Sequence, residues 1–210
     1  MELANLTVKV FLEITAGNDP VPGGGSISAL NGAIAAALSE MVANLTIGRK
    51  KYVDVDALMQ ELAPKFKELQ AKMIADIDRD SEAYNRVFSA FKLPKETDEE
   101  KATRKDAIQR ETKFAAQVPM EVARAVAEIL PAIAEVAHKG NQNAITDATV
   151  AMMCARNAVL GALLNVRINL TSITDQEFVK QMADEANQLE QKAIAAEAEI
   201  LQYVKEQIGL

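Results

Sequence analysis

The chain contains few residues that interrupt regular structure, and this constrains its fold more than any other feature. Its 210 residues include only nine glycines and six prolines, about half of average usage. The long tracts between them carry apolar residues at helical spacing, and no alternation of strands with helices is visible. We therefore expect residues 1–210 to form one all-α domain, an elongated bundle of five to six mostly long helices.

Capping and helix-breaking residues delimit the expected helices. Residues 3–16 precede a glycine-rich stretch, although their VKVF segment equally suits a strand. Thr97–Glu100 and Thr174–Glu177 each match a capping box. The later helices are expected at about 26–48, 54–92, 98–139, 143–170 and from 174 onward. Proline inside a helix removes a backbone donor, so kinks or breaks are expected at Pro64, Pro119 and Pro131.

Composition argues against several classes of function. One cysteine and one histidine cannot build a zinc finger or a zinc deaminase site. Glu135 and His138 form a single Glu-x-x-His motif, whereas a di-metal bundle needs two, so no metal is expected. The net charge of −7 and the absence of tryptophan argue against nucleic acid as a partner.

Neither a signal peptide nor a membrane span is expected. The N-terminal residues lack a basic segment followed by an apolar run, so we expect a cytoplasmic protein. Residues 26–48 are long enough to span a membrane. However, Asn31, Glu40 and Asn44 interrupt this tract and its bulk is alanine, so we expect a core helix.

Two segments are candidate ligand sites, each with a purely structural alternative. Gly23, Gly24 and Gly25 precede Ser26 at a helix start, where free N–H groups and missing side chains allow close approach of a ligand. The same run equally suits a permissive connection between helices. Residues 49–51 place three cations after the alanine-rich helix, either as an anion site or as a complement to the helix dipole.

Polar residues also cluster within the expected helices. Asp76 and Asp80 are four residues apart, so their like charges should raise the pKa of at least one of them. A carboxyl with a raised pKa can act as a general acid or base, although most acidic clusters on helices are solvated faces. A wet cleft or a subunit contact, or close helix packing, is suggested by polar and small residues at steps of four, namely Asn157, Gly161, Asn165 and Asn169.

Seven sequence blocks occur in a characteristic order: PGGGSISAL, MVANLTIGRKKY, IDRDSEAY, FKLPKETDEEK, VPMEVA, GNQNAITDA and NVRINL. Together they resemble the cyclodeaminase domain of formiminotransferase-cyclodeaminase and its stand-alone bacterial relatives, which include methenyltetrahydrofolate cyclohydrolases. The resemblance extends from about residue 5 to 180. It implies an all-α homodimer that acts on a tetrahydrofolate derivative near the glycine-rich segment, without a metal or a prosthetic group.

The resemblance also implies roles for individual residues. The family's proposed proton donor is the second aspartate of a D-x-D-x-E-A-aromatic block, which is Asp80 in this chain. We extend the expected substrate-binding site to residues in matching blocks, namely Gly23, Gly24, Gly25, Ser26, Lys50, Lys51, Asp78, Asn141, Asp147 and Asn165. The lysines would meet the carboxylates of the folate glutamate tail.

Two reactions at the N5/N10 bridge of the folate agree with this resemblance. A cyclohydrolase adds water to 5,10-methenyltetrahydrofolate and forms 10-formyltetrahydrofolate. A cyclodeaminase closes 5-formiminotetrahydrofolate to the methenyl cation and releases ammonia. We favour the cyclohydrolase, because no fused formiminotransferase domain supplies a formimino product. The hypothesis from another class is a non-catalytic helical scaffold, which the heptad-like last helix would suit.

Overall fold

The computed structural model describes residues 2–209, and within this range the chain is helical with no strand. Six α-helices are present: α1 (Val8–Thr15), α2 (Gly24–Thr46), α3 (Asp56–Phe91), α4 (Asp98–Lys139), α5 (Ile145–Leu170) and α6 (Gln176–Ile208). Three 3-10 turns accompany them: η1 (Leu3–Asn5), η2 (Lys50–Val55) and η3 (Gln142–Ala144). The predicted all-α fold is confirmed, and the segment that also suited a strand forms η1 and α1.

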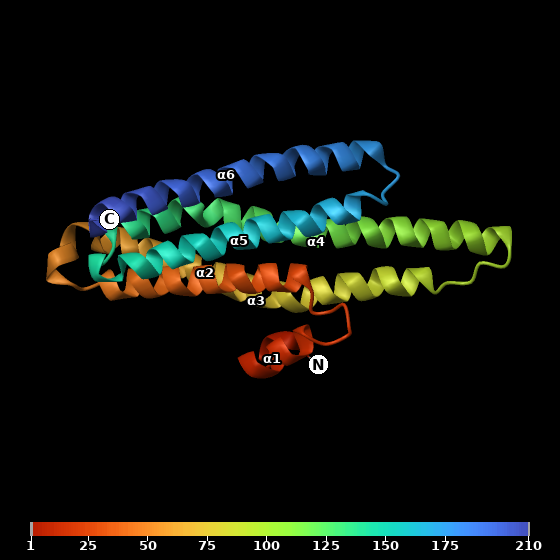
Figure 1. The fold of residues 1–210 in the computed structure, drawn as a ribbon, viewed down its shortest axis with the longest axis horizontal. Helices are drawn as coiled ribbons and strands as arrows, with labels where there is room; N and C mark the ends of the chain where they lie inside the picture. Colours follow the sequence, from red (N-terminus) through yellow and green to blue (C-terminus); the bar gives the residue numbers. More distant parts are fainter. Residues whose placement is uncertain (1, 210) are drawn as a thin grey trace.

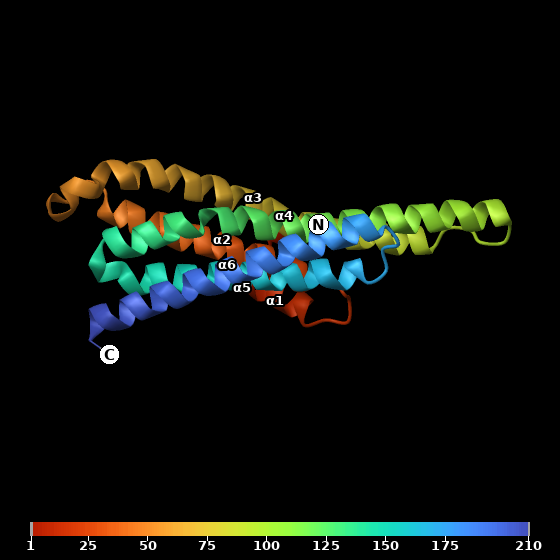
Figure 2. The ribbon, with the colours of Figure 1, turned by 90° about the horizontal axis from the view of Figure 1, so that it is seen from above.

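Four helices form an elongated up-and-down bundle. In chain order α2, α3, α4 and α5 each pack against the next, and α5 returns to pack against α2. The sixth helix, α6, covers α4 and α5, while α1 lies to one side of the bundle (Figure 1). The hairpin of α3 and α4 extends beyond the other helices (Figure 2). The two ends of α2 are about 35 Å apart, because the rise of a helix is 1.5 Å per residue.

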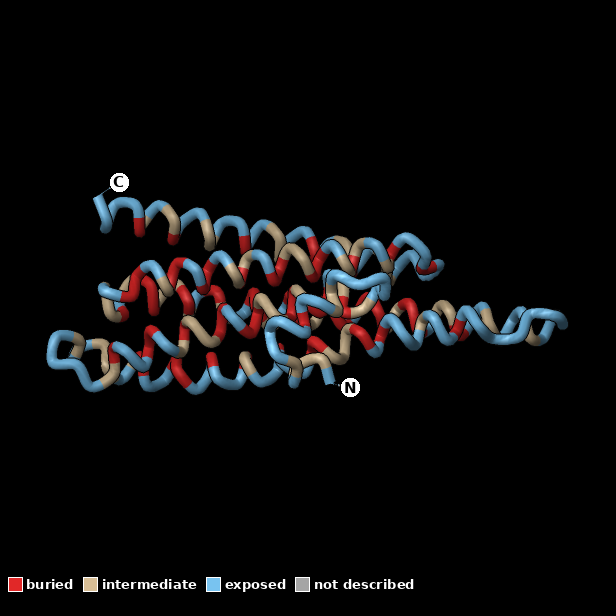
Figure 3. The backbone as a smooth tube through the Cα atoms, turned by 60° about the horizontal axis from the view of Figure 1, so that its bottom comes forward, coloured by how far each residue is buried: buried red, intermediate tan, exposed pale blue. Residues whose placement is uncertain are grey.

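Small side chains let the central helices approach closely. The buried residues of α2 and α5 are mostly alanine, and a β-carbon at Gly32 would lie 2.8 Å from the sulfur of Met73 on α3. Polar side chains inside this core are satisfied locally, since the hydroxyls of Ser39 and Thr46 donate to carbonyls four residues earlier. Figure 3 shows buried residues along the middle of the bundle and exposed residues at the tip of the α3–α4 hairpin.

One of the two predicted capping boxes is present. Thr97 Oγ1 accepts a hydrogen bond from the Glu100 N–H at 3.1 Å, and the Glu100 carboxylate accepts from the Thr97 N–H at 3.0 Å. The second box was wrong. The N-cap of α6 is Asp175, which accepts from the Phe178 N–H at 3.2 Å, because Thr174 is instead held by Gln109 on α4.

The prolines do not divide the helices. The third helix continues through Pro64, and α4 continues through Pro119 and Pro131, although α3 is visibly bowed along its length (Figure 2). Proline cannot donate to the carbonyl four residues earlier, so each one leaves an acceptor free. At Pro64 that acceptor is the carbonyl of Gln60, an exposed residue, and at Pro131 it is the carbonyl of the buried Ala127. The buried Pro119 instead frees the carbonyl of Ala115, which lies at the pocket described below.

Two helices, α2 and the segment from Gln142 to Leu170, are long and apolar enough to cross a membrane by length and composition alone. About half of each apolar window is buried inside the bundle, 56% and 50% respectively. Core helices of globular proteins share this property, and these two helices pack against each other at the centre of the fold.

Candidate active site

A pocket of about 300 Å³ opens where the N-terminus of α2 meets α3 and α5. Asp80 is the one carboxylate among the described residues that line it. The other lining residues come from the segment before α2 and from three helices: Pro20, Val21, Gly23, Ala83, Tyr84, Val87, Ala115, Asn165, Ile168 and Asn169. The pocket therefore joins three predicted site residues that are far apart in the sequence, namely Gly23, Asp80 and Asn165.

The glycine run is the beginning of α2 and not a loop. Gly23 is the N-cap, and Gly24 and Gly25 are the first two helical residues, so the helix starts two residues earlier than expected. A β-carbon on Gly25 would lie 2.0 Å from Asp80 Oδ1, closer than any real contact. Glycine is therefore needed here because the Asp80 carboxylate lies directly against the backbone of α2.

Ser26 holds the carboxylate of Asp80 from inside the bundle. Its hydroxyl lies 3.2 Å from Asp80 Oδ2 and 2.9 Å from the carbonyl oxygen of Ile77, and its backbone N–H also donates to Asp80. The Ser26 side chain is 0% exposed. It therefore cannot touch a ligand in the pocket, and the predicted substrate-binding role of Ser26 becomes a positioning role.

Burial raises the pKa of Asp80 above its ordinary value. The two hydrogen bonds from Ser26 oppose this rise, because they stabilise the ionised form. The nearby charge of Asp76 raises the pKa further, but contributes less than burial. The pKa of Asp80 is thus raised, as predicted. The predicted cause, repulsion between Asp76 and Asp80, contributes less than burial.

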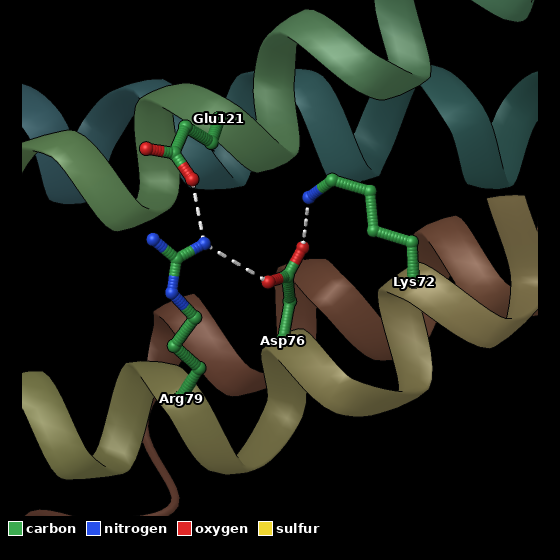
Figure 4. Close-up of polar contacts among 4 residues, drawn as sticks. All are labelled: Lys72, Asp76, Arg79 and Glu121. Carbon is green, nitrogen blue, oxygen red and sulfur yellow. Dashed lines mark hydrogen bonds and ion pairs between the residues drawn. The ribbon is translucent and has the colours of Figure 1, made fainter.

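The weak influence of Asp76 follows from its partners. Asp76 is 3% exposed and accepts from Lys72 Nζ at 2.5 Å and from Arg79 at 3.4 Å. Arg79 also binds Glu121 on α4 at 2.5 Å (Figure 4). Two cations therefore neutralise Asp76, and one of them, Arg79, also joins α3 to α4, so the charge of Asp76 is largely compensated before it acts on Asp80.

The two asparagines of α5 occupy the opposite wall of the pocket. Asn165 Nδ2 donates to the carbonyl of Gly161 at 2.9 Å, and this amide would lie 3.1 Å from a β-carbon on Gly24. Asn169 Nδ2 donates at 3.0 Å to the carbonyl of Ala115, the one that Pro119 leaves free. The amide groups are therefore fixed through their nitrogens, and their oxygens can accept hydrogen bonds from a ligand.

Asp78 lies outside the pocket, so the structure does not support its predicted substrate contact. Its carboxylate accepts from the backbone N–H groups of Leu3 at 2.6 Å and Ala4 at 3.2 Å. Two residues apart on α3, Asp78 and Asp80 point in different directions because a helix turns by about 200° over that step. Asp78 therefore fixes the N-terminal segment against α3.

The remaining predicted residues lie at the other end of α2. Arg49, Lys50 and Lys51 line a hollow of about 400 Å³ together with Tyr52, Asn141 and Asn143. Lys50 and Lys51 are exposed, and neither forms an ion pair within residues 2–209. We call residues 49–52 with 141–143 the basic end. Within one chain the basic end does not join the Asp80 pocket.

Asn141 and Asp147 have structural positions at the basic end. Asn141 caps η3 by accepting from the Asn143 N–H at 3.1 Å, and its own N–H donates to Thr46 Oγ1 at 2.8 Å. Asp147 lies in the first turn of α5, where a carboxylate complements the helix dipole. Neither residue approaches Asp80 in one chain, so their predicted substrate contacts are not supported by this geometry.

Comparison with known proteins places this arrangement in a family. The formiminotransferase-cyclodeaminase family model matches residues 7–188, which include the whole Asp80 pocket and the basic end. The chain belongs to the formiminotransferase-cyclodeaminase family. The resemblance inferred from the seven sequence blocks is thereby confirmed.

Individual relatives of this family cover the chain almost completely. A methenyltetrahydrofolate cyclohydrolase from Methylorubrum extorquens is 40% identical over 98% of this chain and 99% of its own length. The formimidoyltransferase-cyclodeaminase of Mus musculus is 34% identical over 95% of this chain, which spans 37% of that protein's length. The crystal structure of formiminotetrahydrofolate cyclodeaminase from Thermotoga maritima has a TM-score of 0.87, with 30% identity over 99% of this chain and 100% of that one.

Two prominent residues of the pocket were not among the predicted site residues, although one is the aromatic residue of the aspartate block and the other belongs to the polar stripe of α5. Tyr84 is 41% exposed and its ring is 6.3 Å from that of Phe88, so it offers an aromatic face beside Asp80. Its position four residues after Asp80, one helical turn away, was the available signal. Asn169 likewise follows Asn165 by four residues, but its bond to the Ala115 carbonyl depends on how α4 and α5 pack.

Proposed function

We propose that this chain is a 5,10-methenyltetrahydrofolate cyclohydrolase with Asp80 as its acid–base residue. The observation that carries the proposal is a half-buried carboxyl, held against glycine backbone at a helix N-terminus, in a pocket that also offers two fixed amide oxygens and an aromatic ring. The full-length likeness to the cyclohydrolase of Methylorubrum extorquens supports water, and not an amine, as the second reactant.

The geometry supports the following chemistry. The methenyl substrate is a cation, so the ionised Asp80 stabilises it and orients the N5–C–N10 bridge. A water molecule attacks the bridging carbon and loses one proton to Asp80. The substrate thereby becomes a neutral carbinol. Asp80 then returns this proton to N5 as the N5–C bond breaks, while the carbinol hydroxyl loses its proton to solvent and becomes the formyl group. One proton is released overall, and one carboxyl serves as base and then as acid.

The other pocket residues suit a folate. The ring of Tyr84 can stack on an aromatic part of the substrate. The amide oxygens of Asn165 and Asn169 can accept hydrogen bonds from its N–H groups, which discriminates against molecules that lack such donors. No step in this scheme uses a metal or a prosthetic group.

The test follows the absorbance of the methenyl cation with purified protein. An accelerated loss of 5,10-methenyltetrahydrofolate, with 10-formyltetrahydrofolate as the product, is the expected result. No acceleration over the uncatalysed reaction would contradict the proposal. The control is the same protein with 5-formiminotetrahydrofolate, from which we expect neither methenyl cation nor ammonia.

The cyclodeaminase reaction is the second candidate, and the full-length likeness to the Thermotoga maritima enzyme favours it. The same pocket would then protonate the departing nitrogen, and ammonia would be released from 5-formiminotetrahydrofolate. Ammonia release in the control reaction would replace the cyclohydrolase assignment with this one. If neither folate is turned over and neither raises the melting temperature, the chain acts as a scaffold without chemistry.

We propose further that the protein acts as a homodimer in the cytoplasm, with a second copy covering one face of α2 and α5. These neighbouring helices carry exposed apolar side chains at steps of three, four, seven and eleven residues, namely Ile34, Met41 and Leu45 on α2, with Val150, Met153, Leu164 and Ile168 on α5. Such spacing is typical of a helix that packs against another helix. Ile168, which is 66% exposed, also lines the Asp80 pocket, so this face is continuous with the site.

An antiparallel pairing of α2 with its copy would complete the site. A two-fold axis perpendicular to α2 places the C-terminal end of one α2 beside the N-terminal end of the other. The basic end of one copy would then lie near the Asp80 pocket of its partner, where Lys50 and Lys51 can bind the glutamate tail of the folate. This arrangement explains why residues of one predicted site lie about 35 Å apart in a single chain.

Mixed dimers test this arrangement. One chain carries Asp80→Asn, and the other carries Lys50→Ala with Lys51→Ala. When they are co-refolded, each mixed dimer contains one intact site, so kcat/KM for polyglutamylated folate, measured below KM at low salt, should exceed that of either variant alone. Absence of recovery in dimers that demonstrably mix would contradict a shared site. Leu164→Glu should yield monomers in analytical ultracentrifugation, whereas Phe91→Glu, at a residue that is also exposed but lies at the hairpin tip, should remain dimeric.

A further inference from the structure

Three oxygen atoms, two of them from groups buried inside the bundle, surround the hydroxyl of Ser26. Its Oγ lies 2.9 Å from the carbonyl oxygen of Ile77, 3.2 Å from Asp80 Oδ2 and 3.2 Å from Ser81 Oγ. Ser26 is 0% and Ser81 is 8% exposed, so water does not supply missing hydrogen bonds to this cluster. A serine hydroxyl has one proton to donate and two lone pairs to accept with, so it can donate to one of these neighbours and accept from the others, depending on which of them carries a proton.

The cluster is fully bonded when Asp80 is ionised. The Ser26 hydroxyl then donates to Asp80 Oδ2, and Ser26 Oγ accepts from the Ser81 hydroxyl. The Ile77 carbonyl keeps its helical bond from the backbone N–H of Ser81, four residues later. No buried donor or acceptor of the cluster is left without a partner.

The cluster is also fully bonded when Asp80 is protonated. The carboxyl proton is then donated to Ser26 Oγ, and the Ser26 hydroxyl rotates to donate to the Ile77 carbonyl. The Ser81 hydroxyl continues to donate to Ser26. The two states differ only by a rotation of one hydroxyl group, and neither requires a heavy atom to move.

We propose that Ser26 is a positioning residue that reverses its hydrogen bond with Asp80 each time Asp80 gains or loses a proton, with Ser81 as the constant donor to Ser26. A buried polar group without a partner is costly, so a carboxyl that must be both base and acid needs a neighbour that suits both forms. A backbone N–H can only donate and a carbonyl can only accept, whereas a hydroxyl does either. The proposal rests on the proposed function, since it assigns Asp80 both proton-transfer steps.

The other groups around Asp80 do not serve this purpose. The second helix faces it with glycine backbone and Ser26, α5 with the amides of Asn165 and Asn169, and α4 with Ala115. The nearby titratable groups are Asp76, paired with Lys72 and Arg79, and Tyr84 at the pocket wall. Ser26 thus supplies the hydroxyl that donates to the ionised Asp80 and accepts from the protonated Asp80.

Ser26→Ala tests the proposal through the titration of Asp80 itself. Carbon NMR of protein labelled at the aspartate carboxyl carbons reports this titration, and the Asp80 signal is identified by its loss in Asp80→Asn. Ser26→Ala removes a hydrogen bond from both forms of Asp80, but the bond to the ionised carboxylate is the stronger one, so the titration midpoint of Asp80 should rise by about one pH unit. The acidic limb of the pH profile of kcat/KM should move by the same amount.

Matched variants separate this role from a general loss of structure. Ser39→Ala removes an equally buried hydroxyl of α2 that bonds only to the Ala35 carbonyl, and should leave the midpoint unchanged. Ser26→Thr retains the hydroxyl and should titrate as the unsubstituted protein does. Ser81→Ala should raise the midpoint by a smaller amount, and provides the test if Ser26→Ala does not fold.

An unchanged or lowered midpoint in folded Ser26→Ala would overturn the proposal. The NMR titration requires no turnover, so it still reports on the Ser26–Asp80 pair if the folate reaction is not observed. Failure of the proposed function and failure of this inference are therefore distinguishable.

Discussion

The two ends of α2 carry the two groups of residues that the sequence assigned to one site, and they differ in almost every physical respect. At the N-terminal end, Asp80 is half-buried and held by Ser26 and by the backbone of the glycine run. At the C-terminal end, Lys50 and Lys51 are exposed. The first end is built to hold one group in one place, whereas the second offers charge without fixed geometry.

This difference indicates that one end of α2 serves catalysis and the other serves substrate binding. Chemistry requires a group within a few tenths of an ångström of its place, and only the Asp80 pocket meets that demand. Attraction of a flexible anionic tail requires only charge, since exposed ion pairs tolerate many geometries and contribute little each. We therefore expect substitutions at the two ends to separate turnover from affinity.

The largest effect is expected for Asp80→Asn. Loss of the Asp80 carboxyl should reduce turnover by about 100- to 10,000-fold, because an amide cannot accept and return a proton. Folate binding, measured as a rise in melting temperature, should persist. The control is Asp78→Asn, which changes the same chemical group two residues earlier. It should cost about 1 kcal/mol of stability through Leu3 and Ala4, with turnover retained; equal losses of turnover in both variants would contradict the assignment.

Gly25→Ala should approach the same loss of turnover by a different route. The added β-carbon would lie 2.0 Å from Asp80 Oδ1, so the carboxylate has to leave its position. The matched variant is Gly48→Ala at the basic end, where φ is +74° and no atom lies within 4 Å of the new carbon. That variant should cost about 1 kcal/mol of stability because of its left-handed backbone, while kcat is preserved. Full activity of Gly25→Ala would show that the carboxylate position is not critical.

Lys50→Ala combined with Lys51→Ala should affect affinity alone. We expect KM for polyglutamylated folate to rise about fivefold at low salt, with less effect at high salt because of screening. The value of kcat and the KM for monoglutamate should not change. A fall in kcat, or equal effects on both substrates, would remove the distinction between the two ends.

The smallest effect concerns the pH dependence of stability. The pKa of Asp80 is raised in the folded protein, mainly by burial. As the pH rises from the ordinary pKa to the raised one, the unfolded chain loses the Asp80 proton while the folded chain keeps it, so the free energy of unfolding falls. Asp80→Asn lacks this contribution. Its stability relative to the unsubstituted protein should therefore increase with pH across this window in urea unfolding, and a constant difference would show that the pKa is not raised.

The sequence predicted the fold well because the relevant signals are local. Long apolar periodicity, few glycines and the Thr97 capping box are read within one helix, and α3, α4 and α5 begin and end close to the expected residues. The errors occurred where a tertiary contact replaced a local one. Thr174 fits a capping box, but Gln109 on α4 binds it and the cap shifts to Asp175.

The site was predicted less completely, for the same reason. The seven blocks identified Asp80, the glycine run and Asn165, which the fold brings together. They assigned the proton-donor role to Asp80 but also placed Asp78 in the substrate site, because the direction that each residue faces depends on how α3 packs. They also grouped Lys50, Lys51, Asn141 and Asp147 with the pocket, although these residues lie at the far end of the bundle.

By itself, the amino-acid sequence determined that this protein is a bundle of long helices, and its ordered blocks determined its family, because helix periodicity and motif order are properties of the chain. Only the tertiary structure decided which polar groups meet. Burial sets the pKa of Asp80, Ser26 faces inward and not toward a ligand, and Asn169 binds the carbonyl that Pro119 leaves free on another helix. Each of these depends on the packing of separate helices, which fixes distances and excludes water in ways that no single segment encodes.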